Sequence, residues 1–231
     1  MDPVGILGPL ELDVNGDGDR RGQVARLPGP ARAYASDARL SPDGRQRAVT
    51  VRDLTEAALW IHDLDRGTPT LLAGGGEATW PVWFPDGRRL AFSLLKDGRW
   101  SLAMQPADGT APPQVLLESG PAPSSSTPDG RRLAAVQRGD IVIVSLDDGK
   151  ASVRRLFETP HTEAWPEFSP DGRWLAYGSN VSGRNEVYVR PYPGPGPAEQ
   201  VSIDGGSVPS GTRMEGSCSS SRLGTRRAGG P

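Results

Sequence analysis

The tripeptide Pro-Asp-Gly recurs four times in this chain, and its spacing constrains the fold more than any other feature. Its prolines are Pro42, Pro85, Pro128 and Pro170, which are 43, 43 and 42 residues apart. A period of about 40–45 residues is typical of propeller blades, whereas helical repeats of that length show an apolar rhythm of about 3.6 residues. Apolar residues here alternate with a period of two in short segments. The repeat therefore predicts a series of antiparallel β-blades.

Each repeat contains four short strand segments separated by turns. In the second repeat the segments are TWPVWF (79–84), RRLAFSL (88–94), WSLAMQ (100–105) and PQVLLE (113–118). In the turn after the first segment, proline presets φ, aspartate suits the next position and glycine accepts the left-handed conformation that follows. Such a turn joins antiparallel strands with a glycine bulge.

The predicted fold class is all-β, a β-propeller of four-stranded antiparallel blades. About four and a half blades are legible: a half blade at 8–28 and blades at about 33–73, 78–118, 122–157 and 162–203. The propeller region would span 1–209, followed by an aberrant tail at 210–231 that is rich in Gly, Ser and Arg. Because that tail lacks apolar periodicity, we expect it to be disordered. We also expect a partial or imperfectly closed ring.

The repeats share a large apolar residue beside a small one, which suits sheets that interdigitate face to face. The large column holds Leu90, Leu133 and Leu175, but Arg47 stands there in the first repeat. The third repeat replaces its apolar first strand by residues 124–127, S-S-S-T. We expect the third blade to be the least well packed.

The recurring SPDGRxLA pattern resembles the WD-like repeats of TolB-type propellers, over roughly residues 8–209. The stretches SPDGRWLAYGSNVSGRNEVYVRPYPGPG (169–196) and RAYASDARLSPDGR (32–45) are similar to the C-terminal propeller of bacterial serine/threonine kinases. This resemblance implies a non-catalytic module for protein interaction or sensing, from a receptor-like kinase. Two alternatives stay open: a TolB-like periplasmic envelope protein, or the gating propeller of a prolyl-oligopeptidase-type serine peptidase.

Charge and motifs bear on the partner and on catalysis. The 26 basic and 28 acidic residues give a net charge of −2, which creates no general attraction to nucleic acid or anionic membrane. We expect a protein or peptide partner at the propeller face, no nucleic acid and no direct membrane contact. The sequence contains no H-R-D, D-F-G or G-x-S-x-G motif, so we expect no enzymatic activity. The family resemblance implies a periplasmic or extracytoplasmic location.

Three residues are candidates for ligand or partner binding. Trp80 and Trp165 occupy the same repeat position, and a proline follows each. Periodic recurrence favours packing between blades; exposed at the mouth of a channel, the same rings would anchor a peptide or small ligand. His161, in the connection before a first strand, could line a ligand-binding face. His62 is expected at an edge or on the surface.

One motif has the character of a metal site. Asp13, Asn15, Asp17 and Asp19 alternate in DVNGDGD, as do the oxygen ligands in the first half of a calcium loop. The twelfth position of that loop should be glutamate and is Val24. A polar hairpin turn is the favoured interpretation, with calcium as the alternative; we expect no other cofactor.

Overall fold

The computed structural model describes residues 33–34, 37–52, 56–147, 149–157, 159–206, 208–210 and 219–221. All helical or sheet structure in these ranges is β-strand, arranged in antiparallel four-stranded blades as the sequence predicted. The chain divides into two compact units, Met1–Gly120 and Pro121–Pro231, and each is described by itself. Within the described ranges, no helix has the length and apolar character needed to cross a bilayer.

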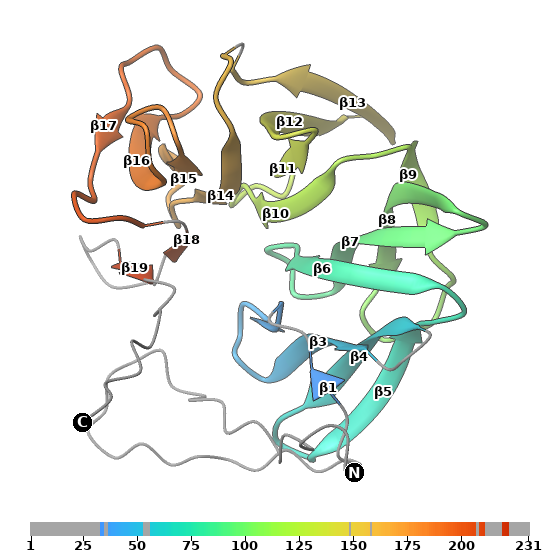
Figure 1. The fold of residues 1–231 in the computed structure, drawn as a ribbon. Helices are drawn as coiled ribbons and strands as arrows, with labels where there is room; N and C mark the ends of the chain where they lie inside the picture. The colour runs from blue at the N-terminus through green and yellow to red at the C-terminus, as the bar shows by residue number, and fades with distance from the viewer. Residues whose placement is uncertain are drawn as a thin grey trace, which may run out of the picture. The chain divides into compact units, whose positions relative to one another are not determined.

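The described residues of the first unit form two blades (Figure 1). The first blade runs β2 (Arg39–Leu40), β3 (Gln46–Arg52), β4 (Ala57–Asp63) and β5 (Thr68–Ala73). The second blade runs β6 (Glu77–Trp83), β7 (Arg89–Lys96), β8 (Arg99–Pro106) and β9 (Gln114–Glu118). A short strand, β1 (Ala33–Tyr34), pairs with the end of β3, and one parallel bridge joins β4 to β6.

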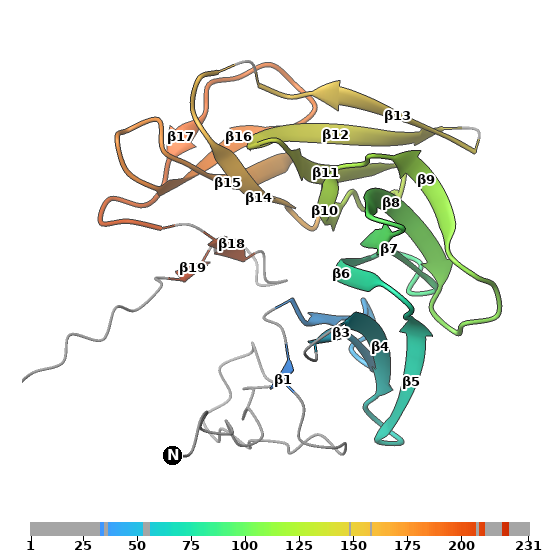
Figure 2. The ribbon, with the colours of Figure 1, turned by 45° about the vertical axis from the view of Figure 1, so that its right-hand side comes forward.

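Two further blades are formed by the part of the second unit that the structure describes (Figure 2). The third blade runs β10 (Ala122–Ser126), β11 (Arg132–Gln137), β12 (Asp140–Asp147) and β13 (Lys150–Arg155). The fourth blade runs β14 (Glu163–Phe168), β15 (Trp174–Ser179), β16 (Glu186–Pro191) and β17 (Glu199–Gln200). A separate short pair is formed by β18 (Val208–Ser210) and β19 (Ser219–Ser221).

The Pro-Asp-Gly turns are held by side-chain hydrogen bonds that repeat from blade to blade. In the first blade the Ser41 hydroxyl donates to Asp43 Oδ1 at 2.6 Å, and the same Oδ1 accepts the Arg45 N–H at 3.1 Å. These bonds lower the pKa of Asp43. Gly44 takes a φ of 72°, which a residue with a Cβ adopts only with strain. The third and fourth blades repeat the arrangement, with Thr127 and Ser169 as the hydroxyl donors.

The second blade makes the same turn without a hydroxyl. Phe84 stands in place of the serine and is fully buried. Arg89 stacks its guanidinium on this ring, 4.6 Å from the centroid, and its Nε donates to Asp86 Oδ2 at 2.7 Å. Arg89 thus takes over the role of the hydroxyl in holding the turn aspartate.

The leucine column of the repeat forms the core of each unit. Leu90, Leu133 and Leu175 are all fully buried, within cores that also hold Phe92 in the first unit and Ile143 in the second. At about 25 cal/mol per Å² of apolar surface, a side chain buried to this degree contributes about 1.5–3 kcal/mol.

The polar first strand of the third blade takes part in the packing between blades. Ser125, in β10, is buried, and its hydroxyl donates to the Pro166 carbonyl at 2.9 Å. It also accepts the Phe168 N–H at 3.1 Å. The polar first strand therefore fastens the third blade to the fourth, while Leu133 and Val142 remain fully buried.

The surface position expected for His62 is wrong. His62 lies directly opposite Arg47 across the β3–β4 pair, and both side chains are buried. Cross-strand partners project to the same face of a sheet, so the imidazole and the guanidinium share one buried environment. Burial, and then the positive charge of Arg47, lower the pKa of His62.

Candidate recognition site

Trp80 is displayed on a bulge of the first strand of the second blade. The pairing of β6 with β7 shifts between Thr79 and Val82, so Trp80 lies where the regular ladder is interrupted. Its backbone N–H donates to Asp37 Oδ2 at 2.9 Å. Trp80 is 48% exposed.

The backbone at Trp80 is strained. Its φ is 53°, a left-handed conformation that is an outlier for a bulky residue, and the following proline favours an extended conformation instead. A non-glycine residue in this region costs on the order of 1–3 kcal/mol, and such residues gather at binding sites. Because the ring is half exposed, burial of the indole does not explain why a tryptophan occupies this position.

Trp165 repeats this arrangement in the fourth blade. The β14–β15 pairing shifts between Ala164 and Glu167, Trp165 has a φ of 50°, and it is also 48% exposed. The preference for buried packing between blades, inferred from periodicity, is therefore wrong for both tryptophans. Their exposure agrees with the alternative, in which the rings contact a partner.

The structure adds a third aromatic ring that the repeat pattern did not single out. Trp100, in β8, lies 5.9 Å from Trp80 between ring centroids, with the planes inclined by 34°, and is 37% exposed. Nothing in the sequence marks this contact, because Trp80 and Trp100 lie on strands separated by β7. The two rings form one exposed aromatic surface.

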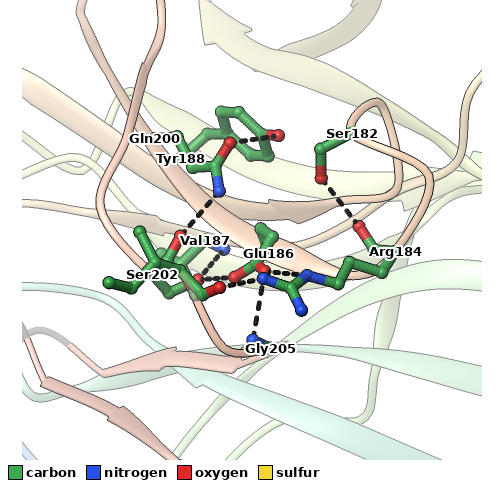
Figure 3. A network of polar contacts seen from close by, with 9 residues as sticks. Ser182, Arg184, Glu186, Val187, Tyr188, Gln200, Ser202 and Gly205 are labelled. Carbon is green, nitrogen blue, oxygen red and sulfur yellow. Dashed lines mark hydrogen bonds and ion pairs between the residues drawn. The ribbon is translucent and has the colours of Figure 1, made fainter.

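The fourth blade has a buried carboxylate at the position that Ser101 occupies in the second blade. Glu186 stands opposite Ser179 as Ser101 stands opposite Leu94, and its side chain is fully buried. Ser202 donates its hydroxyl to Glu186 Oε2, and Oε1 accepts the Gly205 N–H at 3.1 Å (Figure 3). Arg184 Nε lies 2.6 Å from Oε1. These bonds lower the pKa of Glu186, with the Ser202 hydroxyl as the largest cause, so the network keeps an ionised carboxylate satisfied and anchors the 201–206 loop.

His161 lies beside a second buried carboxyl group. It is partly buried in the β13–β14 connection, two residues before Glu163. Glu163 Oε1 accepts the Thr159 hydroxyl at 2.7 Å, while Oε2 is buried and has no hydrogen-bond donor among the described residues. Burial, and also the negative charge of Asp140, raise the pKa of Glu163.

The calcium motif at Asp13, Asn15, Asp17 and Asp19 lies outside the described residues, as does the predicted half blade at 8–28. Across the part of the chain that the structure describes, no group of three or more His, Cys, Asp or Glu side chains could hold a metal ion. The turn aspartates serve their backbone turns. Each of the four accepts the N–H of the residue two positions on through Oδ1.

Comparison with known proteins places the fold. No family model matches the sequence. The chain is 26% identical over 151 residues to the uncharacterized peptidase YuxL of Bacillus subtilis, an alignment that covers 64% of the chain and 22% of that protein. The chain thus spans less than a quarter of that relative's length.

Solved structures with the same arrangement of strands include TolB-type proteins and a prolyl endopeptidase. A structure assigned to TolB from Agrobacterium tumefaciens superposes with a TM-score of 0.66 and 20% identity, over 78% of this chain and 66% of the other. A prolyl endopeptidase superposes with a TM-score of 0.59 and 18% identity, over 82% of this chain and 33% of the other. The chain therefore has the fold of a TolB-type β-propeller, built from four-stranded antiparallel blades.

Proposed function

We propose that this chain is a non-catalytic β-propeller module that binds a protein or peptide partner through the tryptophans of its first strands. The observation that carries the proposal is the repeated, strained and exposed geometry of Trp80 and Trp165. Backbone strain persists only where the surrounding structure or the function requires it, and exposed tryptophans are frequent anchors of binding energy. His161 would contribute from the β13–β14 connection.

The larger protein to which this module belongs is, in this proposal, a bacterial receptor-like serine/threonine kinase. The support is the likeness of residues 169–196 to the propellers that follow such kinase domains. The propeller would then sense or dock a partner, and phosphotransfer would belong to another domain. The TolB-like fold favours a periplasmic or otherwise extracytoplasmic position for this segment.

A second candidate is a propeller attached to a serine peptidase, where it would control access to a separate hydrolase domain. The 26% identity to a Bacillus subtilis peptidase favours it, as does the structural likeness to a prolyl endopeptidase. A free-standing TolB-like envelope protein has equal structural support. In each of these settings the propeller itself supplies recognition rather than catalysis.

Selection of binding peptides from a random twelve-residue phage-displayed library on the immobilised full chain would test the proposal. We expect the enriched peptides to bind the wild type and to lose at least tenfold in affinity for the Trp80→Gly/Trp165→Gly variant. Glycine suits the left-handed backbone at both positions, so the variant should keep its circular dichroism spectrum. Trp174→Ala, which removes another exposed tryptophan of the fourth blade, is the matched control. Peptides that bind the double variant as tightly as the wild type would contradict the proposal.

A further inference from the structure

The first blade has a cavity on the face of its sheet that points away from the core of the first unit. Leu59 projects from β4 into that core, so its neighbours Ala58 and Trp60 project to the opposite face. The strand pairing places Val51 opposite Ala58 and Leu71 opposite Trp60. These four side chains, from β3, β4 and β5, line a cavity of about 360 Å³, which we call the first-blade cavity.

The size and the walls of the first-blade cavity suit a small organic molecule. Ligand sites commonly enclose about 300–1,000 Å³ and combine apolar walls with a few polar groups. Val51 is buried and Leu71 is 50% exposed, so the apolar wall extends from the base of the cavity to its rim. Gly74 and Gly75 follow β5 and complete the lining, and a Cβ at Gly75 would meet no atom within 4 Å. The rim is therefore open at this point.

The charge at the rim of the cavity is negative. Among the described residues that line it, one side chain, that of Glu56, is charged. Glu56 is exposed and directly precedes β4, so it continues the alternating series of Ala58 and Trp60. Arg47 and His62 lie on the same face of the sheet but outside this lining. His62 is six residues beyond Glu56, which is about 20 Å along an extended strand.

We propose that the first-blade cavity binds a small organic ammonium ion, with its charge at the Glu56 carboxylate and its apolar body against Trp60 and Leu71. The face of an indole ring attracts a cation more strongly than any other aromatic side chain does. The exposed carboxylate adds a favourable charge at the rim, where the ammonium group keeps part of its hydration. Glu56 would repel an anionic ligand, and a neutral ligand would gain the apolar contacts alone.

This ligand site is a second function beside partner recognition. The lining of the first-blade cavity includes neither Trp80 nor Trp165. Binding of an ammonium ligand should therefore persist in the Trp80→Gly/Trp165→Gly variant. Loss of binding in that variant, while it remains folded, would overturn the separation of the two sites.

Isothermal titration calorimetry on the full chain tests the ligand assignment. The probes are phenethylamine and two compounds of similar size, neutral phenylethanol and anionic phenylacetate. An end-blocked glycine peptide with a single lysine represents a protein partner. We expect phenethylamine to bind at least about threefold more tightly than phenylethanol, because the carboxylate and the indole each favour the cation. Phenylacetate and the lysine peptide should bind more weakly than phenethylamine.

Variants separate the charge of the rim from the apolar wall. Glu56→Gln should lose most of the preference for phenethylamine, whereas Glu118→Gln, which removes another exposed carboxylate of the first unit, should keep it. Leu71→Ala should weaken phenethylamine and phenylethanol by the same factor, because Leu71 offers apolar contact only. Gly74→Val should block both ligands. A Cβ at Gly74 would lie 3.6 Å from a Leu71 methyl group, an ordinary contact, so the added side chain fills the cavity without a clash.

Three results would overturn the ammonium assignment: equal binding of phenethylamine and phenylethanol, tighter binding of phenylacetate, or an unchanged preference in Glu56→Gln. Absence of phenethylamine binding would overturn it as well. Tighter binding of the lysine peptide than of phenethylamine would assign the cavity to a protein partner and would contradict a small-molecule ligand.

Discussion

Replacing Ser125 by alanine should loosen the fourth blade from the third. The hydroxyl fills two roles at once, as acceptor for the Phe168 N–H at 3.1 Å and donor to the Pro166 carbonyl at 2.9 Å. Ser125, Pro166 and Phe168 are all buried, so water does not readily replace the hydroxyl. The substitution therefore leaves one buried donor and one buried acceptor without a partner.

The size of the effect follows from those two orphaned groups. Leaving a buried polar group unsatisfied costs about 1–3 kcal/mol, and partial relaxation around alanine reduces the sum for two groups to about 2–4 kcal/mol. A tenfold change in an equilibrium corresponds to about 1.4 kcal/mol, so the population of opened states at this contact should rise on the order of 30- to 1000-fold.

Native-state hydrogen exchange is the suitable assay, because a chain with two compact units need not unfold in a single step. We expect the Phe168 amide to lose about 30- to 1000-fold of its protection in Ser125→Ala. Ser124→Ala is the matched control, since the Ser124 hydroxyl makes no hydrogen bond among the described residues and the side chain is partly exposed. Equal Phe168 protection in the two variants would refute the assigned role of Ser125.

Three further predictions concern stability. In urea unfolding, Trp80→Gly should lower the free energy of unfolding by at most about 2 kcal/mol, because relief of left-handed strain offsets the lost contacts of a half-exposed ring. Trp83→Ala, at a buried tryptophan, should lower it by about 3–5 kcal/mol, and equal losses would contradict the exposed role of Trp80. Because the pKa of Glu163 is raised, the contribution of this group to stability is full below the unfolded pKa and is lost as pH rises through the folded pKa. Glu163→Gln should therefore gain stability relative to wild type between pH 4 and 7, and a difference in unfolding free energy that stays constant across that range would count against this. The pKa of Asp129 is lowered, chiefly by the Thr127 hydroxyl, so the contribution of Asp129 to stability is present above the unfolded pKa and is lost as pH falls below about 4. When unfolding is measured at pH 3 and pH 6, Asp129→Asn should destabilise the protein more at pH 6, and an equal effect at both would refute the turn role.

The blades were predictable because the turns that punctuate them are local. Pro42, Asp43 and Gly44 specify their hairpin corner with side chains and φ preferences contained within about six residues. Four copies at a near-constant spacing then determine the architecture, since each blade must pack against a neighbour of the same kind. The departure at Phe84 leaves the turn intact, because Arg89 supplies the missing contact from five residues away.

The features of the candidate site were harder to predict because their partners lie about one repeat away or on another strand. Asp37 reaches the Trp80 amide 43 residues on, and Ser125 reaches Phe168 across the same separation. A sequence pattern identifies such positions as equivalent without revealing that a bulge turns the tryptophan outward. Glu186 would likewise be expected on the surface from its charge, but the 201–206 loop covers it and supplies its hydrogen-bond donors.

The most direct test of the central claim is the affinity of library-selected peptides for the Trp80→Gly/Trp165→Gly variant, measured by anisotropy beside the wild type. The account holds that these residues are displayed to bind a partner rather than to pack the blades. It predicts at least a tenfold loss of affinity in a variant that remains folded. Undiminished affinity in the folded variant would contradict it.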